Sequence, residues 1–321
     1  MWPSISISFI AFFVAALTVG FLARSRVLNL ALDKPNERSL HTNPVPRTGG
    51  LGLLLGIAAA WIFISPQLHW SVWAALTILT IVSLLDDFRG LSAAVRFASH
   101  LIAAALSAPA LLGDQSILLI VPAILAIGWM CNLYNFMDGS DGLAGGMAVS
   151  GFLTYAVAAW LSSNVQFAAL NLAIASAAAG FLLHNFHPAR IFLGDAGAVP
   201  LGFLAAAFGI IGWRQGNWTW WFPLLVFSPF IVDASATLVR RLLAGSRVWE
   251  AHRDHYYQRL VQIGLGHRGT ALLEYAVMFL CASASLWAMT LNLTDQYLVL
   301  VISTLLYVVA IAVVERLWRK R

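Results

Sequence analysis

Long apolar segments are the feature of this sequence that most restricts its fold. Crossing the hydrocarbon core of a bilayer takes about 20 helical residues, and a chain inside lipid must satisfy its backbone hydrogen bonds internally. Eleven segments approach or reach that length. We therefore expect an all-α polytopic bundle of about eleven transmembrane helices, forming a single integral-membrane domain over residues 1–321, with spans at roughly 5–23, 49–64, 71–85, 94–112, 117–137, 145–163, 165–186, 199–214, 218–243, 271–292 and 297–318.

The composition agrees with a membrane protein and excludes an ordinary soluble domain. The chain is 60% hydrophobic and only 10% charged, with a mean hydropathy of +0.80, whereas a soluble domain carries about 25% charged residues. The lipid bilayer is therefore one of its expected partners. The net charge of +5 reports topology, as the next paragraph argues, and does not indicate nucleic-acid binding. Cys131 and Cys281 both lie in apolar segments, so no disulfide framework is expected.

The positive charges predict the orientation of the bundle. With eleven spans, 18 of the 19 lysines and arginines fall on one face, and only Arg214 falls on the other. Positive charge marks the cytoplasmic side of a membrane protein. We therefore expect the N-terminus outside and the C-terminus in the cytoplasm. The long polar loops are all cytoplasmic in this arrangement, so the functional site is expected on that face.

A polar sequence, NLYNFMDGSDGLAGG, closes the predicted span 117–137. Asn132, Asn135, Asp138 and Asp141 follow one another at intervals of three, and Gly139 indicates that the helix ends near Asp138. Residues at i and i+3 are neighbours on a helix, so we expect Asn132 and Asn135 to face the bundle. Because the helix is expected to end near Asp138, Asp138 and Asp141 are expected on the loop beyond it. Capping a helix end is the alternative reading, but capping needs one such residue. Four polar groups therefore favour a functional site.

Further acidic residues lie at the same predicted face. Asp86 and Asp87 end a span in SLLDDFRGLS, and Asp195 follows another span in NFHPARIFLGDAG. Two adjacent aspartates alone would be typical of a solvated helix end. Together with Asp138 and Asp141, they predict a ring of carboxylates around one end of the bundle.

Oxygen ligands of this kind suit Mg²⁺, which binds through one or two carboxylates together with substrate phosphates. Basic residues, including Arg190 and the cluster between Arg247 and Arg268, lie near the same face. Carboxylates, a hard metal ion and basic groups together indicate phosphoryl transfer from a polyphosphate. The spacing of His252 and His255 could suit zinc, but further ligands are missing, so contact with phosphate or sugar is favoured.

Four motifs together resemble those of a known family. They are NLYNFMDGSDGLAGG, DDFRGLS, NFHPARIFLGDAGA and AHRDHYYQRL, and they are similar to those of the polyprenyl-phosphate N-acetylhexosamine-1-phosphate transferases. That superfamily also contains the phospho-N-acetylmuramoyl-pentapeptide translocase. The resemblance implies a Mg²⁺-dependent enzyme of the bacterial inner membrane. It would transfer a sugar 1-phosphate from a UDP-amino sugar to undecaprenyl phosphate and release UMP.

The resemblance also implies roles for individual residues. Asp195 and Asn135 match metal ligands. The catalytic acids would be Asp86, Asp87, Asp138 and Asp141. Substrate binding is assigned to Asn132, Asn185, Arg190, His252, Arg253 and His255.

Departures from the translocase pattern favour one branch of the superfamily. The translocases have three consecutive histidines and a lysine in the first loop, whereas here the two histidines are separated and Lys34 lies well upstream of Gly49. We therefore expect an enzyme that starts O-antigen, lipopolysaccharide or a similar surface polysaccharide. Its donor would be a UDP-N-acetylhexosamine, such as UDP-N-acetylglucosamine, or a 6-deoxy relative.

Two alternatives to this interpretation stay open. The first is the pentapeptide translocase itself. The second is a transporter, which would carry its polar groups near the midplane of the membrane on broken helices of paired repeats. Neither feature is evident in the sequence. The assembly is left open between a monomer and a homodimer.

Overall fold

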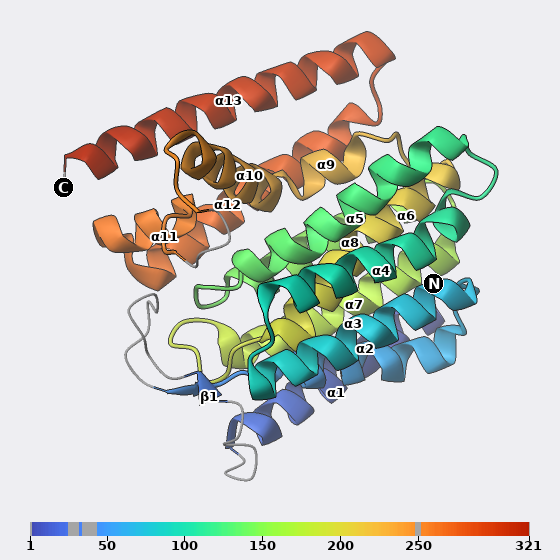
Figure 1. Ribbon diagram of the computed structural model, residues 1–321. Coiled ribbons are helices and arrows are strands. Elements are labelled where there is room, and N and C mark those ends of the chain that lie inside the picture. The colour runs from blue at the N-terminus through green and yellow to red at the C-terminus, as the bar shows by residue number, and fades with distance from the viewer. Residues whose placement is uncertain (1, 25–31, 34–43, 248–251, 321) are drawn as a thin grey trace.

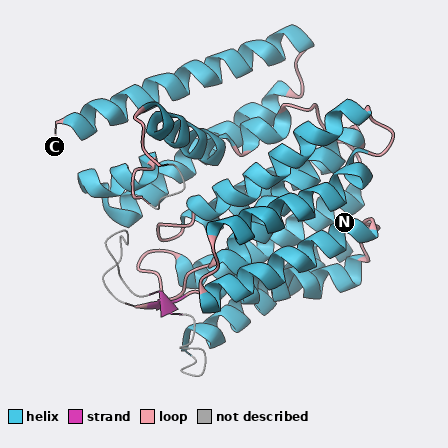
Figure 2. Ribbon diagram, viewed as in Figure 1, coloured by secondary structure: helices cyan, strands magenta, loops and turns pink. Residues whose placement is uncertain are grey.

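The computed structural model describes residues 2–24, 32–33, 44–247 and 252–320. Most of the predicted first loop, including Lys34, lies outside this part of the chain. The described residues are almost entirely helical (Figure 2), and strands β1 (Leu32–Asp33) and β2 (Val45–Pro46) form a single short antiparallel pair. The predicted all-α membrane fold is therefore confirmed.

The helices follow the chain in a simple order. They are α1 (Trp2–Arg24), α2 (Gly49–Ile64), α3 (Trp70–Arg89), α4 (Ala93–Leu112), η2 (Ile117–Leu119), α5 (Ile120–Phe136), α6 (Leu143–Leu161), α7 (Val165–Asn185), α8 (Asp195–Arg214), α9 (Phe222–Val226), α10 (Ser228–Leu243), α11 (Tyr256–Leu260), η3 (Val261–Leu265), α12 (Gly266–Ala288) and α13 (Leu293–Arg319).

All eleven predicted segments are helical, but the count of eleven spans stays a prediction. Nine helical segments in the described chain are long and apolar enough to cross a membrane, and α2 has only 16 residues. The predicted span 218–243 is broken into α9, with five residues, and α10, with 16. Pro223 and Pro229 lie at the starts of these two helices, where a missing backbone N–H is tolerated and a new helix can begin.

The packing places α8 at the centre of the bundle. In its most apolar stretch 83% of the residues are buried, against 6% for α13. Helix α8 contacts α3, α5 and α2, while α1, α2, α6 and α7 pack together beside it. Figure 1 shows α13 at the edge of the bundle. In the same view α10 is seen nearly end-on, whereas the neighbouring helices are seen from the side. The chain therefore changes direction between α9 and α10.

The polar loops gather at one end of the bundle. The short β-strand pair, the loops after α3, α5 and α7, and helix α11 all lie at that end (Figure 1). The start of α1 and the end of α13 lie at opposite ends of the molecule. This arrangement agrees with an odd number of crossings. Which end faces the cytoplasm stays a prediction.

Candidate active site

The N-terminal end of α8 is where four helices bring polar residues together. Asp195 is the first residue of α8, and its carboxyl lies within hydrogen-bonding reach of Asn135 on α5 and Asp86 on α3. Nη1 of Arg96, in the first turn of α4, lies 3.3 Å from a carboxylate oxygen of Asp86 and 3.6 Å from one of Asp195. Three predicted site residues thus meet here.

Asp87 contributes to this meeting point in a different way from Asp86. Its two carboxylate oxygens accept hydrogen bonds from the backbone nitrogens of Asp195 (3.1 Å) and Ala196 (3.0 Å). The first N–H groups of a helix have no partner within the helix, and the helix dipole favours a negative charge beside them. The buried Asp87 therefore fixes the start of α8 against the end of α3.

Gly194 permits the close approach of the chain at this point. Its φ of +72° is in the left-handed region, and a Cβ added here would lie 2.2 Å from the carbonyl oxygen of Arg47. The backbone nitrogen of Gly49 also donates to the carbonyl oxygen of Phe192, at 2.9 Å. The start of α2 is therefore attached to the loop before α8.

Asp138 joins the same group from the loop after α5. Helix α5 ends at Phe136, so Asp138 lies just beyond it, as predicted. Its carboxyl accepts a hydrogen bond from the backbone nitrogen of Gly194. Burial, with the nearby Asp195 and Asp87 carboxylates, raises the pKa of Asp138 well above its usual range.

The residues around the start of α8 fit a hard divalent cation. Four carboxylates gather here, and the neighbouring guanidiniums, Arg96 and Arg47, are fewer than the acids. Among the described residues no three His, Cys, Asp or Glu side chains enclose a metal by themselves. Mg²⁺ commonly takes only one or two protein carboxylates and completes its shell with water and phosphate. Asp195 and Asn135, which lie together, could supply the protein ligands.

Asp141 forms a second group of contacts on the same loop. One of its oxygens lies 2.6 Å from Nδ1 of His187 and accepts from the backbone nitrogen of Ala189 at 3.1 Å. Nδ1 of His267, at the start of α12, lies 3.8 Å from the other oxygen and 2.9 Å from Oγ of Ser140. The two imidazoles are stacked with their centroids 5.7 Å apart.

Three predicted substrate-binding residues, on α5, on α7 and in the loop after α7, differ in burial and in hydrogen-bond partners. Asn185 is buried, accepts from the backbone nitrogen of Gly142 (3.0 Å) and donates to the carbonyl oxygen of Ile191 (2.9 Å). It therefore holds two loops together. The amide of Asn132 donates within its own helix, to the carbonyl oxygen of Gly128. The side chain of Arg190 is exposed and can reach a ligand from solvent.

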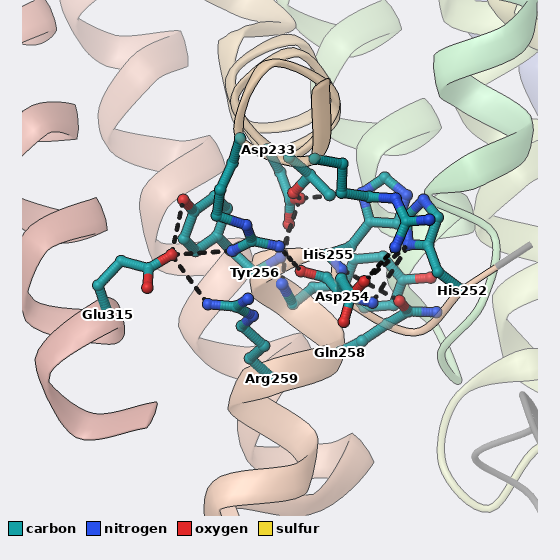
Figure 3. Close-up of polar contacts among 12 residues, drawn as sticks. Asp233, His252, Asp254, His255, Tyr256, Gln258, Arg259 and Glu315 are labelled. Atoms are coloured by element: carbon teal, nitrogen blue, oxygen red, sulfur yellow. Dashed lines mark hydrogen bonds and ion pairs between the residues drawn. The ribbon is translucent and has the colours of Figure 1, made fainter. Parts of the chain in front are cut away.

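His255 belongs to a network around Asp233 on α10. One oxygen of Asp233 lies 3.1 Å from Nδ1 of His255 and accepts from the backbone nitrogen of Tyr256 at 3.0 Å. The other oxygen accepts from the backbone nitrogen of Tyr257 at 2.8 Å. Figure 3 shows Asp233, which lies within α10, directed toward His255 and Tyr256 at the start of α11. A buried carboxylate thus holds this five-residue helix in place.

His252 and Arg253 lie just before α11. The imidazole of His252 lies 5.0 Å from that of His255, measured between centroids, and burial with the charges on His255 and Arg241 lowers the pKa of His252 to about 4. His252 is therefore neutral at physiological pH. The side chain of Arg253 is exposed.

Comparison with known proteins identifies the family. The family model described as glycosyl transferase family 4 matches residues 69–213. A protein of Mycobacterium leprae named decaprenyl-phosphate N-acetylglucosaminephosphotransferase is 31% identical over 300 residues, which cover 76% of this chain and 73% of that protein. The chain belongs to glycosyl transferase family 4.

Other relatives of this family 4 chain carry two kinds of name. A Bacillus subtilis protein named probable undecaprenyl-phosphate N-acetylglucosaminyl 1-phosphate transferase is 29% identical over 308 residues, covering 87% of this chain and 86% of the relative. A Latilactobacillus sakei phospho-N-acetylmuramoyl-pentapeptide-transferase is 28% identical over 253 residues, covering 70% of this chain and 78% of the relative. The resemblance inferred from the four motifs is therefore confirmed at the level of the superfamily.

The sequence did not predict three residues of the candidate site in this family 4 protein. Arg96 lies ten residues after Asp86, in the first turn of the next helix, and that proximity was an available signal. His267 and Ser140 come from distant parts of the chain. The motif GLGHRG marks His267 as a polar residue at a helix start, but nothing local indicates its partner.

Proposed function

We propose that this protein transfers a sugar 1-phosphate from a UDP-linked N-acetylhexosamine to a polyprenyl phosphate. The observation that carries the proposal is the meeting of Asp86, Asp87, Asn135, Asp138 and Asp195 at the start of α8. All five lie inside the part of the chain that the family model matches. A membrane-embedded acceptor and a water-soluble donor must meet at the membrane surface, and the site lies at one end of the helices.

The proposed reaction exchanges one phosphoanhydride bond for another. A phosphate oxygen of the polyprenyl phosphate attacks the phosphorus that carries the sugar. The bond from this phosphorus to the oxygen shared with UMP breaks, and UMP leaves with that electron pair. The product is a polyprenyl-diphospho-sugar that stays in the membrane. Such transfers depend mainly on positioning and on stabilising negative charge.

Asp195 and Asn135 would hold Mg²⁺, and the other residues would position the groups around the ion. When bound, the ion supplies charge neutralisation on the diphosphate and its leaving group. Asp87 fixes the backbone at Asp195, and Asp86 orients Arg96 beside it. Asp138 lies close to Asp195 and Asp87, so it would lie beside the reacting phosphates if they bind at this point. Nη1 of Arg96 lies within 4.0 Å of both Asp86 and Asp195, so Arg96 is suited to a phosphate oxygen.

The donor would be held by groups on the neighbouring loops. Asp141 lies on the loop that also carries Asp138, and it contacts His187 from the loop after α7 and His267 from the start of α12. Arg190 and Arg253 offer exposed guanidiniums at the same end of the bundle. Nδ1 of His255 contacts Asp233, so His255 would help to hold the start of α11 in place. His252, which is neutral, can hydrogen-bond to a sugar or phosphate without adding charge.

We propose undecaprenyl phosphate as the acceptor, and an N-acetylglucosamine-type sugar or its 6-deoxy relative as the donor sugar. The product would start O-antigen, lipopolysaccharide or a similar polysaccharide at the cytoplasmic face of the bacterial inner membrane. The names of the relatives from Bacillus subtilis and Mycobacterium leprae support the sugar and the lipid class. The pentapeptide donor is the second candidate, because relatives with that activity in their names also match.

A product analysis with purified protein tests the proposal. UDP-N-acetylglucosamine, UDP-N-acetylmuramoyl-pentapeptide and a 6-deoxy UDP-N-acetylhexosamine are each incubated with undecaprenyl phosphate and Mg²⁺. We expect UMP release only with acceptor present, and a lipid product whose mass equals that of the acceptor plus the sugar 1-phosphate minus one water. Turnover of the pentapeptide donor alone would favour the second candidate. UMP release that does not require the lipid would contradict the proposal.

A further inference from the structure

Helix α13 contacts the site end of the molecule through Glu315, and the Arg259 guanidinium also lies over the ring of Trp318 on α13, 5.0 Å from its centroid. Its buried residues, Gln296 and Val299, both lie near its N-terminal end, and most of its length faces outward. Near its other end, Oε1 of Glu315 accepts hydrogen bonds from Nη1 of Arg240 at 2.8 Å and Nη1 of Arg259 at 2.8 Å. Figure 3 shows these contacts reaching from α13 to α10 and α11.

Glu315 is the negatively charged partner of two guanidinium groups, those of Arg240 and Arg259. Among the described ion pairs, it is the only carboxylate within 4.0 Å of either Arg240 or Arg259. Both guanidiniums also lie over the ring of Tyr256, at 5.1 and 5.7 Å, and the Tyr256 hydroxyl donates to the same Glu315 oxygen at 3.2 Å. Removing the negative charge would leave these two like charges close together without the carboxylate that pairs with both.

These contacts continue to the candidate active site. Nη2 of Arg240 donates to the carbonyl oxygen of Asp254 at 2.6 Å, immediately before α11. On α11 itself, the hydroxyl of Tyr257 donates to the carbonyl oxygen of Phe136 at 3.0 Å. Phe136 is the last residue of α5, and a Cβ added at Gly139 would lie 2.1 Å from the same hydroxyl. Helix α11 therefore lies directly against the loop that carries Asp138.

We propose that Glu315 is a positioning residue. It holds α11 in place, and through Tyr257 it holds the loop with Asp138 in the arrangement that phosphate transfer needs. A five-residue helix has no stability of its own, so its position depends on such tertiary contacts. The kinetic part of this inference rests on the proposed function.

A double-mutant cycle tests the kinetic part. Glu315→Gln should lower kcat/KM about tenfold, and Tyr257→Phe should lower it by a similar factor. Because both changes act on the same contact with the loop, the double variant should be little worse than either single one. Multiplying effects would overturn the proposal. Arg316→Gln is the matched control, since this neighbouring exposed residue on α13 should leave kcat/KM unchanged.

Hydrogen exchange tests the structural part without any activity. In Glu315→Gln, the backbone amides of Tyr256 and Tyr257 should exchange faster, while those at the centre of α8 keep their wild-type rates. Glu315→Asp keeps the charge on a shorter side chain and should give an intermediate rate. Unchanged exchange at α11 would overturn the inference. If wild-type protein releases no UMP, the proposed function fails, and the exchange result alone decides whether Glu315 positions α11.

Discussion

Asp87 holds the backbone of Asp195, the residue proposed to bind the metal ion. Its carboxylate accepts from the backbone nitrogens of Asp195 at 3.1 Å and of Ala196 at 3.0 Å, although the two aspartates are 108 residues apart. This contact joins α3 to the start of α8. It also separates the roles of two adjacent acids, because Asp86 turns instead to Arg96 and to the backbone nitrogen of Leu91.

Replacing Asp87 should reduce stability as well as activity. In Asp87→Asn, the amide NH₂ group would face one of the two backbone N–H donors, so one buried hydrogen bond to a charged group is lost. We expect a loss of about 1–3 kcal/mol in the free energy of unfolding, seen as a lower Tm in detergent. Asp114→Asn, at an exposed position, is the control. A variant with the wild-type Tm would show that Asp87 does not act by fixing α8.

The close contact between α2 and α8 should not accept a methyl group. A Cβ on Gly50 would lie 2.4 Å from Cα of Gly197, which is backbone and cannot move aside easily. Gly50→Ala should therefore cost about 1–3 kcal/mol of stability and reduce activity by displacing the start of α8. Gly269→Ala meets nothing closer than 3.4 Å and should be neutral or slightly stabilising. Equal Tm values for the two variants would contradict this account.

His252 should make stability fall in mild acid. Its pKa is lowered to about 4 in the folded protein, against about 6.5 in an unfolded chain. Between these values the unfolded chain binds a proton that the folded protein does not, so the free energy of unfolding decreases as the pH drops. The Tm of His252→Gln should therefore fall less than that of wild type between about pH 7 and pH 5. Equal decreases would mean that His252 titrates normally.

The orientation can be tested with single cysteines at exposed positions. The native Cys131 and Cys281 are buried, so they should not react in the folded protein. Ser116→Cys, before η2, should react with a membrane-impermeant thiol reagent in intact cells. Ser246→Cys, after α10, should react only after the membrane is opened. Labelling in the reverse pattern would place the candidate site outside the cytoplasm.

The sequence predicts the helices of this fold better than the contacts between them. Each apolar segment indicates a helix by itself, because burial in lipid is decided segment by segment. The break between α9 and α10 was not predicted, since 218–243 is apolar enough to suggest one span; Pro223 and Pro229 are the local signals of the two helix starts. The end of α5 near Asp138 was predicted, because the glycines after it are a local signal.

The candidate site was predicted as a set of acids, and its internal organisation was not. Asp86, Asp138, Asn135 and Asp195 do meet, but nothing near Asp87 in sequence says that it holds the start of α8. Likewise, the contact of Asp233 with α11 joins residues 22 to 24 positions apart in the sequence. Such pairings depend on how the helices pack, which sequence periodicity does not specify.

The dependence of UMP release on Asp195 tests the central claim most directly. Purified wild-type protein and Asp195→Asn are compared in UMP release from UDP-N-acetylglucosamine and undecaprenyl phosphate over a range of Mg²⁺ concentrations, with Asp295→Asn as the control at an exposed position. The account predicts Mg²⁺-dependent release for wild type and the control. For Asp195→Asn it predicts none, with the protein still folded in the membrane fraction. Near-normal turnover of Asp195→Asn at ordinary Mg²⁺ concentrations would contradict it.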